Sequence, residues 1–201
     1  MVAQAISDNS IDKKTLSLLL ASKSPRRRQL LSQLGFPVRF VDIDVDETID
    51  GSTPVELIAA SLAMLKSKGF CGELKPDEIL VTADTIVVHK GEVLGKPHDR
   101  DEAVSMLRSL SGDVNTVYTG VALKSLSRTV TFTERSDVFF RQLSEDVINH
   151  YVAQGTCMDK AGAYGIQEWI GMVGVERIEG CYYNVMGLPL SRIYKELSLF
   201  H

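Results

Sequence analysis

The sequence has little cysteine and no recognisable cysteine pattern. Its cysteines are odd in number and none belongs to a C-x-x-C pair, which argues against a disulfide framework and against a zinc knuckle. Reduced thiols are the simplest interpretation, and they favour a cytoplasmic location. No apolar run approaches the length of a transmembrane helix, and the polar N-terminal segment is unlike a signal peptide, so we expect no membrane partner. The three cysteines are Cys71, Cys157 and Cys181.

The sequence also lacks the motifs of several well-known enzyme classes. It contains no G-x-x-x-x-G-K-[ST] phosphate loop, no G-x-G-x-x-G, no G-x-S-x-G and no H-E-x-x-H. These absences argue against a kinase, a Rossmann dehydrogenase, a serine hydrolase and a zinc peptidase. The histidines have no metal-ligand spacing, and we expect all four at the surface: His89, His98, His150 and His201.

Charge and organisation indicate one ordinary globular domain that does not coat nucleic acid. The net charge is −4, so we expect no nucleic-acid partner, although a small anion can bind where a few cations converge. No repeat, low-complexity tract or linker divides the chain. We expect residues 1–14 to form a flexible tail and residues 15–201 to form a single domain.

Strand-like and helix-like segments alternate irregularly, with hairpins among them. This order predicts an α/β fold with a mixed, twisted β-sheet flanked by helices, not a clean doubly wound sheet. Strands are expected at about 16–20, 38–41, 79–88, 92–94, 116–123 and 130–140. Helices are expected from Ser24 to Gly35, after a Thr53-Pro54-Val55-Glu56 capping box with Leu57, Ile58, Leu62 and Leu65 on the apolar side, and from Asp99, Ser144 and about Pro189.

Two arginines lie at the expected start of the first helix. Ser24 is a good N-cap, and Pro25 suits the first helical position, where a missing N–H costs nothing. The free N–H groups of this helix end favour an anion, and the planar forks of Arg26 and Arg27 match phosphate oxygens. The segment therefore indicates either a phosphate site or a capped surface helix with solvated arginines, and alone it does not distinguish them.

An aspartate interrupts the apolar strand expected at 79–88. Burial of Asp84 is costly unless it has a partner or a function, and a carboxylate there suits metal binding or proton transfer. A structural aspartate that accepts hydrogen bonds at a strand break, beside its threonine neighbours, is the alternative. Lys96, in a G-K-P segment after the hairpin, can face the same cleft as Asp84; otherwise it is a solvated loop charge.

A later segment is rich in small residues: Asp159-Lys160-Ala161-Gly162-Ala163-Tyr164-Gly165-Ile166-Gln167. Small residues let a backbone approach a ligand closely, and Tyr164 and Gln167 add aromatic and polar contacts. A glutamine offers both a donor and an acceptor, which suits the imide edge of a pyrimidine. As structure alone, the segment is a glycine-rich turn before a strand. Further on, Tyr182 and Tyr183 fit a core or an interface equally well.

Five motifs occur in order along the chain: S-x-S-P-R-R at 22–27, A-D-T at 83–85, G-K-P at 95–97, D-K-A-G-A-Y-G-I-Q at 159–167 and Y-Y-N-V-M-G-L-P at 182–189. Together they resemble the Maf family of nucleotide pyrophosphatases, from about residue 16 to the C-terminus. The resemblance implies two lobes around a nucleotide-binding cleft. It also implies hydrolysis of a nucleoside triphosphate to the monophosphate and pyrophosphate, with a divalent cation.

The resemblance further implies roles for individual residues. Lys66 and Lys96 would neutralise charge on the leaving pyrophosphate. Asp84 matches the proton acceptor that activates the attacking water, although it suits a ligand of a metal-bound water as well. Glu47 matches a second carboxylate that holds the metal, for which Mg²⁺ or Mn²⁺ is expected. The residues that bind the substrate would be Ser22, Ser24, Arg26, Arg27, Thr85 and Gln167.

The segment A-G-A-Y-G-I-Q resembles the subgroup that acts on dTTP and UTP, and Arg26, Thr85 and Gln167 match positions tied to that choice. The same hydrolysis of 7-methyl-GTP is an alternative within the family. The chain departs from the family pattern at Glu168-Trp169 and at Cys181, and Trp169 either walls the base or simply packs. A non-catalytic nucleotide binder that regulates cell division or septum formation is the alternative from another class. The family also makes a homodimer plausible.

Overall fold

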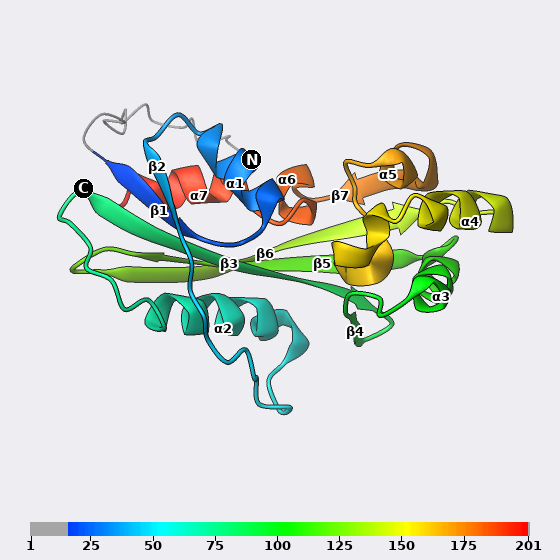
Figure 1. Ribbon diagram of the computed structural model, residues 1–201, viewed down its shortest axis with the longest axis horizontal. Coiled ribbons are helices and arrows are strands. Elements are labelled where there is room, and N and C mark those ends of the chain that lie inside the picture. The colour runs from blue at the N-terminus through cyan, green and yellow to red at the C-terminus, as the bar shows by residue number, and fades with distance from the viewer. Residues whose placement is uncertain (1–15, 201) are drawn as a thin grey trace, which may run out of the picture.

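The computed structural model describes residues 16–200 and contains a seven-stranded mixed sheet (Figure 1). The strand order is β2-β1-β3-β5-β6-β7, and β4 pairs with β3 beside this path. β1 is parallel to β2 and β3, whereas the other pairs are antiparallel, which confirms the expected mixed α/β fold. The strands are β1 (Ser17–Ala21), β2 (Val38–Val41), β3 (Glu78–His89), β4 (Glu92–Leu94), β5 (Val114–Lys124), β6 (Thr129–Phe140) and β7 (Val175–Glu179).

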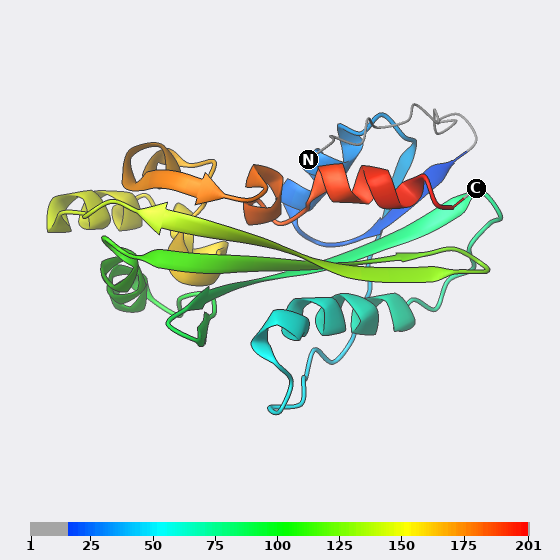
Figure 2. The ribbon, with the colours of Figure 1, turned by 180° about the vertical axis from the view of Figure 1, so that it is seen from behind.

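Helices form two groups along the long strands, as the front and back views show (Figure 1 and Figure 2). At one end, α2 lies on one face of the sheet and α1 and α7 lie on the other; α3, α4 and α5 gather at the far end. Helices α1 and α7 pack on one apolar core and α3, α4 and α5 on another, while Ala59 of α2 belongs to a separate, smaller cluster with Ile86 and Val88. The helices are α1 (Pro25–Ser32), α2 (Val55–Lys68), α3 (Arg100–Leu110), α4 (Glu145–Ala153), α5 (Trp169–Gly174), α6 (Tyr182–Val185) and α7 (Leu190–Leu197), with 3₁₀ turns η1 (Thr156–Asp159) and η2 (Ala161–Ala163).

Helix α2 lies close to the sheet because a glycine faces it. A Cβ on Gly120 of β5 would lie only 2.2 Å from the carbonyl oxygen of Ala59, so a side chain there would push the helix away. The hydroxyl of Thr82 on β3 donates a 2.7 Å hydrogen bond to the carbonyl oxygen of Ala63 and fixes the helix from the same side. These contacts place Lys66, near the end of α2, above the middle of β3.

Two predictions for α2 are wrong. The expected capping box does not form, because Pro54, whose side chain has no acceptor, takes the N-cap position and no side chain caps the helix. Thr53 therefore lies outside the helix. Leu57 is 50% exposed, because α2 turns its small residues Ala59 and Ala63 toward the sheet instead.

Two other local predictions also need correction. His89 is buried, not exposed, and its Nε2 lies 3.0 Å from a carboxylate oxygen of Asp113, which compensates for its burial. Helix α1 ends at Ser32, short of Gly35, whose φ of +81° is outside the helical region. His98 and His150 are exposed as expected. His201 and the expected tail at 1–14 lie outside the described residues.

No helix in residues 16–200 has the length and apolar character needed to cross a membrane. All three cysteines are free thiols, in agreement with the prediction from their number and spacing.

Candidate active site

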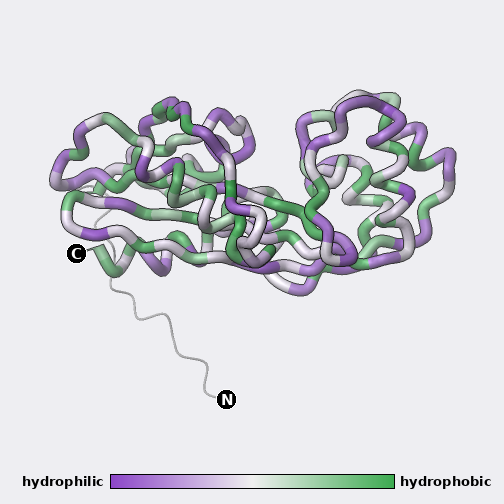
Figure 3. Tube along the Cα trace, turned by 90° about the horizontal axis from the view of Figure 1, so that it is seen from below, coloured by the Kyte–Doolittle hydropathy of each residue, from purple (hydrophilic) through white to green (hydrophobic). Residues whose placement is uncertain are grey.

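The two helix groups and the strands under them form two lobes, one with α1, α2 and α7 and the other with α3, α4 and α5, which Figure 3 shows side by side. A cavity of about 510 Å³ is lined by residues of both lobes. Its walls come from the loop after β1, the start of α1, the loop after β2, α2, the middle of β3 and the segment 159–167. Every residue expected at the site lines this one cavity: Ser22, Ser24, Arg26, Arg27, Glu47, Lys66, Asp84, Thr85, Lys96 and Gln167.

The sheet itself determines where this cavity forms. β1 pairs with β3 only as far as Thr82, and β4 begins to pair at Val87. Between these points, that edge of β3 has no neighbour among the described strands, and Asp84 and Thr85 lie in the gap. The gap adjoins the carboxyl end of β1, where the chain turns into α1. Ligands bind α/β sheets at such carboxyl ends, where the order of the strands changes direction.

Hydrogen bonds within the loop after β1 shape the start of α1. The Ser24 side chain accepts a 3.4 Å hydrogen bond from the N–H of Arg27, which confirms Ser24 as the N-cap, and Pro25 is the first helical residue. The hydroxyl oxygen of Ser22 accepts a 3.2 Å hydrogen bond from the N–H of Ser24. Both serines therefore hold the backbone in the conformation that directs the helix start at the cavity.

Arg27 is half-buried, and its guanidinium donates its hydrogen bonds to the protein itself. It donates hydrogen bonds of 2.9 Å to the carbonyl oxygen of Gly187, 2.8 Å to that of Ala83 and 2.9 Å to the hydroxyl of Thr85. Burial lowers the pKa of the guanidinium, and Asp84 opposes that change. Arg27 therefore joins α1, the open edge of β3 and the loop before α7, a structural role that the sequence did not indicate.

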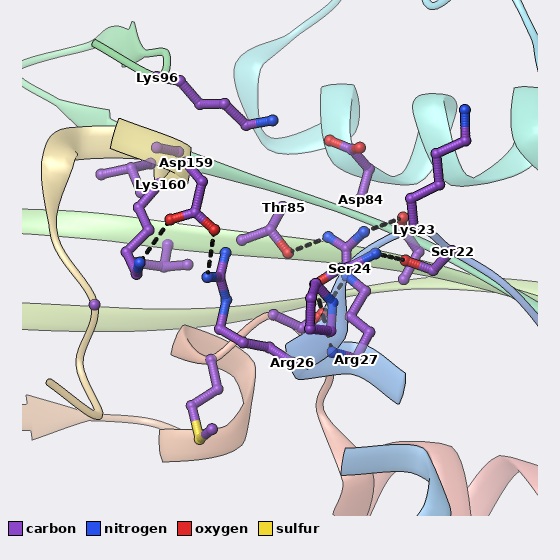
Figure 4. Close-up of a pocket in the computed structure, with 18 of the residues that line it drawn as sticks. Ser22, Lys23, Ser24, Arg26, Arg27, Asp84, Thr85, Lys96, Asp159 and Lys160 are labelled. Atoms are coloured by element: carbon purple, nitrogen blue, oxygen red, sulfur yellow. Dashed lines mark hydrogen bonds and ion pairs between the residues drawn. The ribbon is translucent and has the colours of Figure 1, made fainter. Parts of the chain in front are cut away.

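Arg26 connects the two lobes. Its guanidinium lies 3.0 Å from a carboxylate oxygen of Asp159, which belongs to the other lobe (Figure 4). The second carboxylate oxygen of Asp159 lies 2.6 Å from the ammonium of Lys160. Burial alone would raise the pKa of Asp159, but Lys160 and Arg26 outweigh that effect and hold the pKa below its ordinary value. Asp159 thus stays charged and forms an ion pair with Arg26, a cation that lines the cavity.

Asp84 and Glu47 share one lysine. The ammonium of Lys66 lies 2.6 Å from Asp84 and 3.1 Å from Glu47. Lys66 and Asp84 are both largely buried. The ion pair between them, and not a neighbouring threonine, therefore compensates for the free-energy cost of burying Asp84. Thr85, on the opposite face of β3, shares a 2.9 Å hydrogen bond with Thr119 of β5.

The cavity carries more positive than negative charge. Six cations and four carboxylates line it: Lys23, Arg26, Arg27, Lys66, Lys96 and Lys160, against Asp44, Glu47, Asp84 and Asp159. A fully ionised triphosphate with one divalent cation carries about two negative charges, because the metal offsets half of the phosphate charge. The charge of the cavity lining therefore complements a metal-bound triphosphate.

The carboxylates suit a metal that the substrate helps to hold. Within the described part of the chain, no group of three or more His, Cys, Asp or Glu side chains forms a metal site. Asp84 and Glu47 are nevertheless close together, since both contact the ammonium of Lys66. Magnesium accepts one or two carboxylates, several waters and phosphate oxygens in one octahedron. The two residues fit that pattern.

Three side chains in the later motifs have distinct positions. Lys96 is exposed and points across the cavity toward Asp84 (Figure 4), and Gln167 lines the cavity from the other lobe. Tyr164 is buried, and its hydroxyl donates a 2.8 Å hydrogen bond to Asn115, so its polar group is already used. Trp169 does not line the cavity and packs edge-on against His150. Of its two interpretations, packing is therefore the one that the structure supports.

Some residues of the site were missed by sequence reasoning, namely Lys23, Asp44, Asp159 and Lys160. Asp159 and Lys160 are the first two residues of the small-residue segment. Two adjacent residues of opposite charge in that position were the sequence feature that could have indicated a role in the site. Tyr182 and Tyr183 are 41% and 44% exposed, so neither belongs to the core.

Comparison with known proteins adds independent information. The family model described as Maf-like protein matches residues 17–200. The chain is 48% identical to a dTTP/UTP pyrophosphatase of Bacteroides thetaiotaomicron, over 90% of this chain and 94% of that protein. It is 45% identical to proteins of the same name from Parabacteroides distasonis (93% of this chain, 97% of that one) and Bacillus anthracis (92% and 95%).

Proposed function

The chain belongs to the Maf family, and from this premise we propose that it hydrolyses dTTP and UTP to the nucleoside monophosphate and pyrophosphate. Relatives of that name share 42–48% of its residues over at least 90% of its length. One structural observation supports the proposal most directly: Lys66 contacts both Asp84 and Glu47 in a cavity whose lining is rich in cations.

The phosphate groups bind where cations face the cavity. Arg26 and Lys66 contact carboxylates in the structure, and a triphosphate competes with those carboxylates for them. The start of α1 adds its positive dipole end, although the N–H groups of Ser24 and Arg27 already bond to serine side chains. Arg27 acts less directly: it holds this helix end against β3, so that the phosphates meet a fixed surface.

Asp84 accepts the proton of the attacking water. The water oxygen bonds to the α-phosphorus, the bond from that phosphorus to the bridging oxygen breaks, and pyrophosphate leaves. Lys66 orients Asp84 at 2.6 Å, and Lys66 and Lys96 offset the charge that develops on the leaving pyrophosphate. A divalent cation held by Glu47 and Asp84, Mg²⁺ or Mn²⁺, would supply further charge neutralisation.

Gln167 reads the base. Its amide offers one donor and one acceptor, the pair that a thymine or uracil imide edge requires, and it lines the lobe opposite Arg26. Thr85 contributes through its hydrogen bonds to Arg27 and Thr119, which set the floor of the cavity. A nucleotide substrate and free thiols also support a cytoplasmic location, and a homodimer stays a prediction from the family.

A substrate panel tests the proposal. Pyrophosphate release is measured with dTTP, UTP, CTP, GTP and 7-methyl-GTP, with Mg²⁺, with Mn²⁺ and with a chelator. We expect rapid hydrolysis of dTTP and UTP, little of the others, and loss of activity when the metal is removed. Preferred hydrolysis of 7-methyl-GTP would overturn the choice of base, and tight nucleotide binding without hydrolysis would favour the regulatory binder.

A further inference from the structure

A buried tyrosine hydroxyl joins both ends of the turn that carries Gln167. The turn runs from Gly165 to Glu168 and is closed by a 2.9 Å hydrogen bond from the N–H of Glu168 to the carbonyl oxygen of Gly165. The N–H of Gly165 donates a 3.2 Å hydrogen bond to the hydroxyl oxygen of Tyr151, on α4. The same hydroxyl donates its proton to the carboxylate of Glu168.

The Tyr151 hydroxyl has no evident purpose in packing alone. The side chain is fully buried among apolar neighbours, where a phenylalanine would pack equally well. A hydroxyl in such a place costs free energy unless it is hydrogen-bonded, and here it bonds to both ends of the turn and also contacts the Thr156 side chain. Its effect is therefore to fix the two ends of the turn relative to each other.

Glu168 holds the turn from a second direction. Its other carboxylate oxygen lies 2.8 Å from the ammonium of Lys160, which is only 6% exposed. The Thr156 hydroxyl adds a 3.0 Å hydrogen bond to the oxygen that Tyr151 contacts. Glu168 is thus bound at both oxygens and has little freedom to move.

The side chain of Gln167 lies against this network. A Cβ built on Gly165 would be 3.0 Å from Nε2 of Gln167, 2.8 Å from Cε of Lys160 and 2.9 Å from Cδ of Glu168. These three side chains therefore close around Gly165, which must lack a side chain. The place of the Gln167 amide depends on the place of this turn.

We propose that Tyr151 and Glu168 are positioning residues for base selection, which act through the turn that carries Gln167. The proposal rests on the proposed function, because Gln167 reads the base there. Neither residue needs to touch the nucleotide. Loss of the Tyr151 contacts lets the Gln167 amide move, which weakens recognition of the thymine edge but leaves the phosphate-binding surface intact. Loss of Glu168 has the same effect on Gln167 and in addition frees Lys160, which lines the cavity.

The test uses equilibrium binding as well as turnover. Binding of the α,β-methylene analogues of dTTP and CTP, and of inorganic tripolyphosphate, is measured for the wild type, Tyr151→Phe, Glu168→Ala and Glu168→Gln. Glu145→Gln is the matched control, because Glu145 pairs with Arg108 at the exposed start of α4, away from the cavity. The kcat for dTTP is measured in parallel.

We expect Tyr151→Phe and Glu168→Ala to lower the preference for the dTTP analogue over the CTP analogue about ten-fold, within the range of coupling between neighbouring groups. Glu168→Gln should recover much of this loss, because its amide oxygen can still accept the Tyr151 proton. Tripolyphosphate binding of Tyr151→Phe, and every property of Glu145→Gln, should match the wild type.

Two results would overturn the proposal. One is an unchanged base preference in both Tyr151→Phe and Glu168→Ala; the other is an equal loss of binding for both nucleotides and tripolyphosphate in Tyr151→Phe, which indicates damage to the whole lobe. Failure of the proposed function has a different signature. In that case the wild type itself releases no pyrophosphate, while its preference for the dTTP analogue, and the dependence of that preference on Tyr151, are still measured by binding.

Discussion

Replacing Asp84 by asparagine is expected to lower kcat for dTTP about 100- to 10,000-fold, the contribution of a well-placed general base. Asparagine keeps the size of the side chain and can still accept the hydrogen bond from Lys66, but it cannot take a proton at neutral pH. The measurement is steady-state pyrophosphate release at saturating dTTP, with the melting temperature as the check on folding.

Asp42→Asn is the matched control for this experiment. Asp42 lies just after β2 and pairs with Arg28 at 3.4 Å on the exposed surface, and it does not line the cavity. It should leave kcat and KM at the wild-type values. A folded Asp84→Asn protein with the kcat of the wild type would remove Asp84 from the chemical step.

Replacing Arg27 by lysine is expected to destabilise the fold and to lower kcat/KM together. One ammonium cannot reach the two carbonyl oxygens and the hydroxyl that the guanidinium contacts, so buried acceptors lose their donors. We expect a loss of about 3 kcal/mol in the free energy of unfolding, since hydrogen bonds to charged groups contribute roughly 1.5–3 kcal/mol each. For a chain of this size that corresponds to a fall of about 6–12 °C in Tm, measured by calorimetry.

Arg26→Lys distinguishes the two adjacent arginines. Arg26 makes one ion pair with the exposed side chain of Asp159, and such pairs contribute about 0.2–1 kcal/mol to stability. The Tm of Arg26→Lys should therefore stay near that of the wild type. Its KM for dTTP should rise, because lysine lacks the planar guanidinium that binds two phosphate oxygens at once. Equal Tm values for the two variants would contradict the structural role of Arg27.

Local rules predicted the parts of the site that depend on a few neighbouring residues. Ser24 and Pro25 are local signals for a helix start, and the structure has that start at the expected place. The capping box after Thr53 failed because Pro54 competes for the cap position, a local conflict that the pattern alone does not resolve. The prediction that Leu57 is on the buried side of α2 was wrong for a different reason. Gly120 on β5, which determines the face of α2 that is buried, lies far from Leu57 in the sequence.

Tertiary contacts explain what sequence reasoning missed. The motif containing Arg26 and Arg27 gave both residues one role, yet their contacts differ: Arg26 pairs with Asp159, whereas the fold brings Ala83 and Gly187 to Arg27. The pairing of Lys66 with Asp84 likewise depends on how closely α2 approaches β3. The hydroxyl of Tyr151, on a helix with ordinary amphipathic spacing, gives no sign in the sequence that it contacts a turn near Gln167.

The most direct test of the central claim, that a water activated by Asp84 attacks the α-phosphorus, is hydrolysis of dTTP in oxygen-18-labelled water. Mass spectrometry of the two products then locates the new oxygen. We predict that the label enters dTMP and that pyrophosphate carries none, because the bond that forms is to the α-phosphorus. Label in the pyrophosphate would show attack at the β-phosphorus and would contradict the placement of Asp84 in this mechanism.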